Sequence, residues 1–166
     1  MLALCARSAV PAFSGPSARY VEQDRFEVSA WREMGRYLAT RPEPNASVAV
    51  IAAGAVPYYS GLPAIDMLGL NDRTIAHREM PRLGTGQAGH EKYDVDYVLD
   101  REPTYMFIGA YGMSPQPRPA RELIHPFYAA ETEMVRSARF RRSYRLVRAQ
   151  TARGYFAFFV RAAAAE

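Results

Sequence analysis

A short stretch of the chain, residues 57–72, combines side chains that could bind a hydroxyl-rich ligand. It reads PYYSGLPAIDMLGLND, and its aromatic, acidic and amide members are Tyr58, Tyr59, Asp66, Asn71 and Asp72. Aromatic rings stack on the apolar faces of sugars, while carboxylates and amides hydrogen-bond their hydroxyl groups. These residue types therefore favour a carbohydrate ligand.

A second constellation is GHEK at residues 89–92. His90 could act as a general base, and Lys92 could bind an anion. Lys92 is the only lysine among the 21 basic residues, which indicates that a compact ammonium group is wanted there. We therefore add His90 and Lys92 to the candidate substrate-binding residues.

Structural roles are the alternative for both constellations. The two tyrosines could pack the edge of a sheet, Asn71 and Asp72 could only cap a helix, and His90 could be a structural hydrogen bonder beside a helix start. The carboxylate pairs Asp94 with Asp96 and Glu131 with Glu133 suit a helix start or a solvated face. We assign no catalytic residue.

Several familiar signatures are missing from the sequence. GxGxxG, the Walker loop and the GxSxG elbow do not occur, and the three histidines lack metal-ligand spacing. We therefore expect neither a cofactor nor a bound metal. Nucleic-acid binding is also not expected, because no RNA-binding signature or zinc-finger spacing accompanies the mild net charge of +4.

Strands and helices alternate along the first two-thirds of the chain. The apolar runs 47–54, 64–69 and 104–110 predict three buried strands, which favours a parallel sheet covered by helices. Ligands collect at the carboxyl ends of such strands. Tyr58, Asp66 and Tyr111 would then become neighbours at one edge of the sheet.

Caps and breakers set the remaining elements. Asp24 and Glu27 have capping-box spacing before a helix over roughly 25–40. Helices are also expected after Asn71 or Asp72, after Asp94 or Asp96, and over 127–138, with irregular loops at 81–89 and 110–126. The final strands span 141–150 and 154–162.

The elements together predict an α/β fold. We expect a three-layer domain with a mixed, mostly parallel sheet and a C-terminal antiparallel hairpin. Residues 1–19 are expected to form a flexible lead-in or the stub of a membrane helix, and residues 20–166 a single domain. Cys5 stands alone, which excludes an intramolecular disulfide, and no apolar run reaches 18 residues.

Two blocks of this sequence resemble a known family. AGAVPYYSGLPAIDMLGLNDRTIAH at 53–77 and GHEKYDVDYVLDREPTYMFIG at 89–109 are similar to the soluble C-terminal domain of bacterial polytopic membrane glycosyltransferases. These enzymes use polyprenyl-phosphate sugars and include arabinofuranosyltransferase- and mannosyltransferase-like members. The resemblance covers roughly residues 19–161 and is specific in the two blocks.

The resemblance implies a role outside the catalytic centre. The catalytic carboxylate of that family lies in a loop between membrane helices that are not part of these 166 residues. It implies a periplasmic or extracytoplasmic domain, tethered to the inner membrane, whose partners are the membrane-embedded part and cell-envelope glycan. The expected function is a non-catalytic accessory domain that contacts the acceptor glycan or the membrane part.

Two other functions are considered. The chain could be a free-standing hydrolase or transferase in which His90 works with Asp66 or Asp72. It could instead be an interaction module that docks through the aromatic strand GYFAFFV at 154–160. The second alternative requires that strand to expose an apolar strip, whereas we expect it to be buried.

Overall fold

The structure is a computed structural model that describes residues 16–41 and 43–162. Its helices are α2 (Pro16–Ala39), α3 (Ala55–Ser60), α4 (Arg73–Ala76), α5 (Val95–Asp100), α6 (Ala129–Arg136) and α7 (Ala138–Ser143), with a 3-10 helix η1 (Ala120–Glu122). Its strands are β1 (Val48–Val50), β2 (Ala64–Asp66), β3 (Tyr105–Met106), β4 (Tyr144–Thr151) and β5 (Gly154–Arg161).

The strands form one mixed five-stranded sheet in the order β2-β1-β3-β5-β4. β1 pairs in parallel with β2 and with β3, whereas β5 pairs antiparallel with β3 and with β4. The α/β class and the mixed sheet are therefore confirmed. Parallel pairs are not the majority expected, because the two longest strands, β4 and β5, pair antiparallel.

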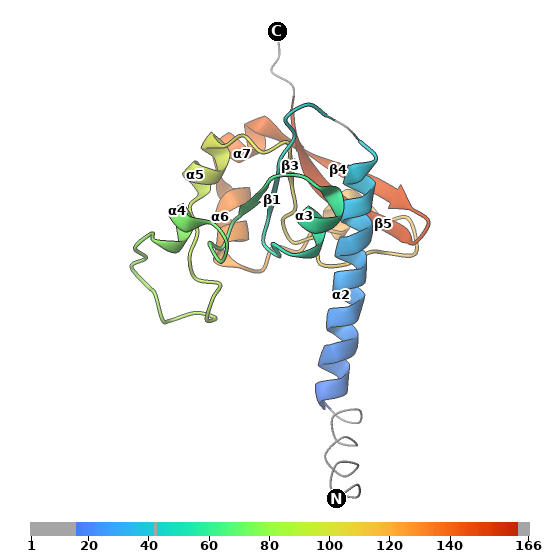
Figure 1. Cartoon of the computed structure of the whole chain (residues 1–166), viewed down its shortest axis with the longest axis horizontal. Helices are drawn as coiled ribbons and strands as arrows, with labels where there is room; N and C mark the ends of the chain where they lie inside the picture. The colour runs from blue at the N-terminus through green and yellow to red at the C-terminus, as the bar shows by residue number, and fades with distance from the viewer. Residues whose placement is uncertain (1–15, 42, 163–166) are drawn as a thin grey trace, which may run out of the picture.

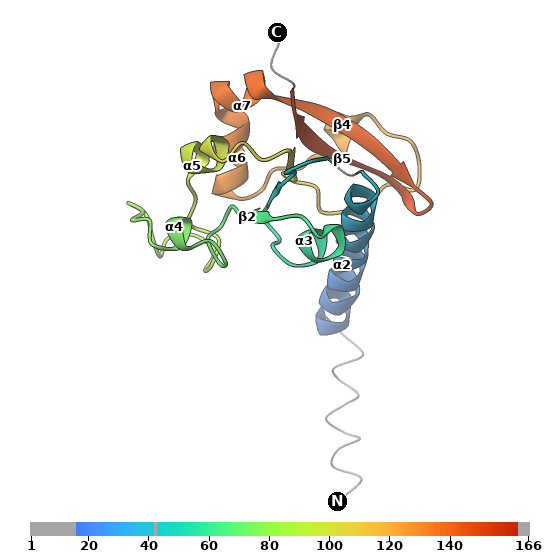
Figure 2. The ribbon, with the colours of Figure 1, turned by 45° about the horizontal axis from the view of Figure 1, so that its top comes forward.

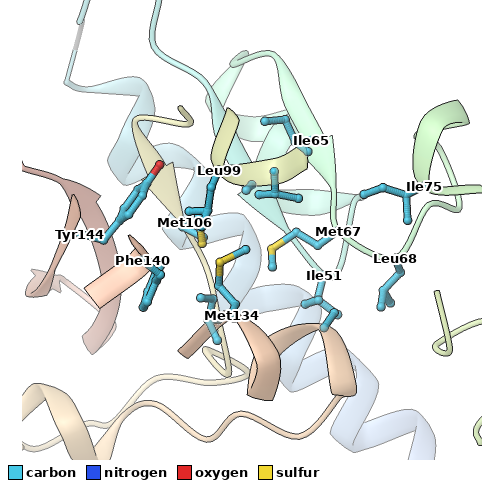
Figure 3. Packing of buried hydrophobic residues seen from close by; sticks show 14 residues of the cluster. Ile51, Ile65, Met67, Leu68, Ile75, Leu99, Met106, Met134, Phe140 and Tyr144 are labelled. Atoms are coloured by element: carbon cyan, nitrogen blue, oxygen red, sulfur yellow. The ribbon is translucent and has the colours of Figure 1, made fainter. Parts of the chain in front are cut away.

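The two faces of the sheet carry separate apolar clusters, because side chains alternate along each strand. Ala49 and Met106 belong to a cluster with residues of α4, α5, α6 and α7, and Figure 3 shows Met106 near Leu99 and Met134. Val48 and Val50 belong to the other cluster, which includes residues of α2 and α3. Figures 1 and 2 show α2 and α3 on one side and α5, α6 and α7 on the other.

Helix α2 begins earlier than the capping-box spacing predicts. Its described part runs from Pro16 to Ala39, so Asp24 lies inside the helix and does not cap its start. The first half of α2 extends beyond the sheet in Figures 1 and 2, and its Tyr20 and Phe26 side chains are exposed.

Two short helices stand where the sequence predicts none. α3 occupies the segment that follows the first predicted strand, so Tyr58 and Tyr59 are helical. It packs so closely on α2 that a Cβ added at Gly35 would lie only 2.7 Å from the carbonyl oxygen of Val56. α7 directly follows α6 and leads into β4.

The structure bears on three further expectations. Of the expected lead-in, residues 1–15 lie outside the described part of the chain, and residues 16–19 belong to α2. No helix within residues 16–41 and 43–162 is both long and apolar enough to cross a membrane. Phe156 and Phe158 of β5 are buried, as expected, which removes the apolar strip that the interaction-module alternative requires.

Candidate functional site

The parallel strands end at a crevice that side chains close. In open α/β sheets the ligand crevice lies outside the carboxyl ends of the strands, where the strand order reverses. Here that point lies between β1 and β3. Trp31, Tyr111 and Glu131 help to line it, and only about 20 Å³ stays free, roughly the space of one water molecule. The edge where we expected the ligand is therefore filled.

Glu131 of α6 is the centre of this closed crevice. Its side chain has no exposed surface. One carboxylate oxygen accepts the backbone N–H of Gly109, and the other accepts the hydroxyl of Tyr111 and the N–H groups of Phe127 and Tyr128, at 2.8 and 3.1 Å. Four donors around one carboxylate replace the water it loses on burial, so the group is satisfied in place.

The tyrosines around Glu131 hold their protons strongly. Burial raises the pKa of Tyr111 well above its usual range, and the hydrogen bond to the Glu131 carboxylate raises it further. Burial and the charge of Glu131 likewise raise the pKa of Tyr128. Both side chains therefore stay neutral phenols, and the hydroxyl of Tyr111 remains a donor to Glu131.

An open cavity of about 660 Å³ lies beside the crevice. The loop between α4 and α5 forms one wall through Pro81, Gln87 and His90, and the start of α6 forms the other through Phe127 and Tyr128. Its volume falls within the range of roughly 300–1,000 Å³ that is usual for small-molecule sites. We take this cavity as the candidate functional site.

Aromatic rings form one side of this cavity. The imidazole of His90 stacks on the ring of Tyr128, with centroids 4.4 Å apart and planes 17° apart. The ring of Phe127 meets Tyr128 edge-on at 5.2 Å and is 73% exposed. An exposed ring beside a stacked pair offers flat apolar surface to a ligand.

The polar groups of the cavity come from its loop wall and from α6. Arg82, Gln87, Glu91 and Glu133 line it. The carboxylate of Glu91 is used within the loop, where it accepts the backbone N–H groups of Gly84 and Gly86 at 2.9 and 2.6 Å. Glu91 therefore holds the loop wall in shape, which leaves Arg82, Gln87 and Glu133 as the polar groups best placed for a ligand.

Two of the predicted site residues, Asp66 and Asp72, support the loop wall. Asp66 is buried and accepts the N–H groups of Leu68 and Asn71, at 3.0 and 2.6 Å, which fixes the turn after β2. Asp72 caps α4 and also accepts the hydroxyl of Tyr97 at 3.0 Å.

Lys92 also supports the loop wall, through a hydrogen bond at the C-terminal end of α4. Its ammonium group donates to the carbonyl oxygen of Ala76, the last residue of that helix. A cation at a helix C-terminus also interacts favourably with the helix dipole. Arg78 and Asp94, one residue from each arm of the loop, form an ion pair.

The predicted site residues do not share one pocket. His90 alone among the seven lines the open cavity. Asp66, Asp72 and Lys92 lie around α4, with Asn71 exposed beside them. Tyr58 and Tyr59 lie on α3, next to α2, where Tyr59 receives the guanidinium of Arg36 over its ring.

Sequence reasoning missed Phe127, Tyr128 and Glu131. The segment FYAAETE predicts a helix, and its pattern assigns Glu131 to a helix start or a solvated face. Glu131 does stand in the first turn of α6, but it is buried rather than solvated. The aromatic pair directly before an acidic first turn was the available signal, and only the fold shows that its rings meet His90.

No metal centre is indicated within the described ranges. No group of three or more His, Cys, Asp or Glu side chains there is arranged to hold a metal ion. The hydrogen bond of the His90 ring goes to the carbonyl oxygen of Ala88 at 3.0 Å, not to a carboxylate. The cavity offers stacking and hydrogen-bonding groups.

Comparison with known proteins identifies a family without a described activity. A family model described as a domain of unknown function, DUF8728, matches residues 18–159. No curated protein and no solved structure matches the chain. The matched span covers nearly all of the described structure, from α2 to β5. The chain therefore belongs to the DUF8728 family.

Proposed function

We propose that this chain is a non-catalytic accessory domain of a membrane glycosyltransferase, and that it contacts carbohydrate through the open cavity. The domain would act at the periplasmic or extracytoplasmic face, next to the membrane-embedded catalytic part. The observation that carries the proposal is the aromatic side of the cavity, His90 stacked on Tyr128 with Phe127 exposed beside them. Such rings bind the apolar face of a sugar.

The polar lining of the cavity supports the same ligand class. Arg82, Gln87 and Glu133 can donate to or accept from hydroxyl groups around a sugar that lies on the rings. A mixture of flat apolar surface and a few polar groups is the usual composition of a small-molecule site. Binding a glycan in this way requires no catalytic group.

The two blocks that carry the family resemblance are joined in space. Tyr97 of the second block donates to Asp72 of the first, and Lys92 donates to Ala76. These contacts hold the base of the loop that walls the cavity. The residues on which the resemblance rests therefore hold the loop wall of the cavity in place, which supports a role for this cavity.

The proposal includes a three-layer arrangement of the domain. α2 and α3 would form one outer layer and α4 to α7 the other, with β4 and β5 as the terminal hairpin of the central sheet. The cavity then lies at one end of the second helical layer. In this arrangement the opposite layer, with the projecting end of α2, is left for contact with the membrane part.

The enzyme alternative finds no support in the geometry of His90. The carboxylates of Asp66 and Asp72 are occupied by backbone N–H groups and by Tyr97. His90 makes no hydrogen bond to either of them, although all three residues are described. A general base and its partner need to be within about 3 Å of one another or of a shared water.

A chemical-shift titration tests the proposal. The isotope-labelled chain is titrated with neutral cell-wall oligosaccharides up to millimolar concentration. We expect shifts in the resonances of His90, Phe127 and Tyr128. The variant Phe127→Ala should weaken binding about tenfold, the loss expected when one stacking ring worth about 1.4 kcal/mol is removed.

Tyr58→Ala is the matched control for Phe127→Ala. Tyr58 is another exposed aromatic residue, 80% accessible, and it lies on α3 outside the cavity. Binding that survives Tyr58→Ala but not Phe127→Ala assigns the ligand to the cavity. Shifts confined to α3, with binding lost in Tyr58→Ala alone, would place the ligand at the tyrosine pair and overturn the assignment.

A further inference from the structure

A second depression adjoins the cavity on the side of α5. It measures about 630 Å³ and runs between the arms of the loop and the end of α6, past Arg78, Asp94, Asp96 and Arg136. Four residues line both depressions: Met80, Pro81, Tyr93 and Glu133. These four residues form the common border of the two depressions, which adjoin along α6 and are together called the groove.

The two halves of the groove differ in character. The half beside Phe127 and Tyr128 presents aromatic rings, whereas the half beside α5 presents charged side chains. In that charged half Arg78 pairs with Asp94, and Arg136 pairs with Glu133 at 2.8 Å. A flat apolar surface that continues into a row of hydrogen-bonding groups suits a chain of sugars better than one sugar.

The groove is also acidic on a basic chain. Three arginines face five carboxylates along it, namely Arg78, Arg82 and Arg136 against Glu79, Glu91, Asp94, Asp96 and Glu133. The whole chain has a net charge of +4. The carboxylates therefore repel an anionic ligand within the groove, because charges act on one another over about 8 Å at physiological salt. The net positive charge of the whole protein attracts such a ligand only from outside the groove.

We propose that this groove binds a neutral oligosaccharide of more than one sugar residue, and that it disfavours glycans with uronic acids or phosphates. This inference rests on the proposed function and specifies its ligand. One sugar stacks on the ring of Phe127, and the following residues of the glycan run past Glu133 toward Asp96 and Arg136. Each added sugar gains contacts without a second loss of translational and rotational freedom.

A length and charge series on the full chain tests the inference by calorimetry. The probes are glucose, galactose, mannose and arabinose, their neutral di-, tetra- and hexasaccharides, and oligogalacturonates of the same lengths. We expect the best neutral tetrasaccharide to bind at least about tenfold more tightly than its monosaccharide. The oligogalacturonates should bind more weakly than neutral chains of equal length, and added salt should narrow that difference.

Two variants divide the groove. Phe127→Ala should weaken mono- and tetrasaccharide binding alike, because the stacking ring serves both. Arg136→Ala should weaken binding of the longer oligosaccharides only, since Arg136 lines the charged half and not the aromatic half. Arg142→Ala, at an exposed arginine on α7, is the matched control and should leave both affinities unchanged.

The outcomes separate this inference from the proposed function. A monosaccharide that binds as tightly as the tetrasaccharide would overturn the extended groove and leave glycan binding in place. Tighter binding of oligogalacturonates than of neutral chains would overturn the neutral class. If no probe binds at millimolar concentration, the proposed function and this inference fail together.

Discussion

Two neighbouring regions of this domain differ in whether their functional-looking side chains are buried or exposed. The crevice at the ends of β1 and β3 is filled, with Glu131 fully buried among four donors. The cavity beside it is open, with Phe127 73% exposed. A polar group that is both buried and satisfied serves the fold, whereas an exposed ring in a depression is available to a ligand. The crevice, where the sequence predicts a ligand, thus serves the fold, and the cavity next to it is open to a ligand.

The backbone of two residues joins the regions. Phe127 and Tyr128 give their N–H groups to Glu131 inside the crevice, and their rings line the cavity outside it. Tyr111, a further donor to Glu131, meets the ring of Tyr128 edge-on at 6.2 Å. The buried carboxylate therefore positions the aromatic side of the cavity without facing the ligand.

The largest effect is expected from Glu131→Ala. It leaves the donors around Glu131 without an acceptor, and each such buried donor costs about 1–3 kcal/mol. Because water can enter the space and satisfy some of them, we expect the free energy of unfolding to fall by about 3–5 kcal/mol. Urea denaturation measures this change.

Glu133→Ala is the control on the same helix. The side chain of Glu133 is 41% exposed and pairs with the exposed side chain of Arg136, so its loss should cost less than about 1 kcal/mol. Equal losses for the two variants would show that Glu131 is no more structural than its exposed neighbour. The contrast between the closed crevice and the open cavity would then not hold.

The next largest effect is a loss of stability at alkaline pH, caused by the buried tyrosines Tyr111 and Tyr144. Burial raises the pKa of Tyr144 to about 12, and the pKa of Tyr111 is also raised, first by burial and then by Glu131. In the unfolded chain both lose their protons near pH 10. Their contribution to stability is therefore complete below about pH 10 and falls as the pH rises toward the folded value, by up to about 1.4 kcal/mol per pH unit for each group.

Denaturation at several pH values from 8 to 11 measures this slope. Tyr111→Phe should lower stability at pH 8, because a hydrogen bond to a carboxylate is lost at a cost of about 1.5–3 kcal/mol. The same variant should show a shallower decline above pH 10 than the parent chain. An unchanged slope would mean that Tyr111 titrates alike in the folded and unfolded states.

The sequence predicts contacts that lie close along the chain. The sequence predicts Asp72 and Asp94 as possible caps, and each caps its helix through N–H groups two or three residues ahead. That pattern is visible in the residues themselves. The runs 47–54 and 64–69 likewise predict strands, and each run contains one, β1 and β2, although both are shorter than the runs.

Contacts between distant segments could not be predicted in this way. Gly109 and Glu131 are 22 positions apart, and nothing in either segment names the other as its partner. The sheet-edge rule placed Tyr58, Asp66 and Tyr111 together, but the six-residue helix α3 takes Tyr58 away toward α2. The rule gives the edge where ligands gather and does not show whether side chains already fill it.

A smaller and local effect is expected from Glu91→Ala. Its carboxylate holds the N–H groups of Gly84 and Gly86, so its removal should open this part of the loop wall. Two lost hydrogen bonds of about 0.5–1.5 kcal/mol each predict about tenfold faster amide exchange at Gly84 and Gly86. Gln87→Ala, in the same exposed loop, is the control and should leave exchange there unchanged.

Global stability should hardly respond to Glu91→Ala, because residues 81–89 are exposed and contribute little to the core. Exchange at Gly84 and Gly86 that equals that of the parent chain would mean that other contacts shape the loop wall. The cavity would then keep its form without Glu91.

The smallest effect is expected from Phe127→Ala in the absence of ligand. The ring is 73% exposed, and its backbone N–H, which bonds Glu131, is untouched by the substitution. Stability should therefore change by no more than about 0.5 kcal/mol in urea denaturation. A loss above about 1 kcal/mol would show that the ring packs as part of the core. In that case the flat surface beside His90 would be structural, like the crevice, and a weaker glycan affinity of this variant could not be assigned to lost stacking.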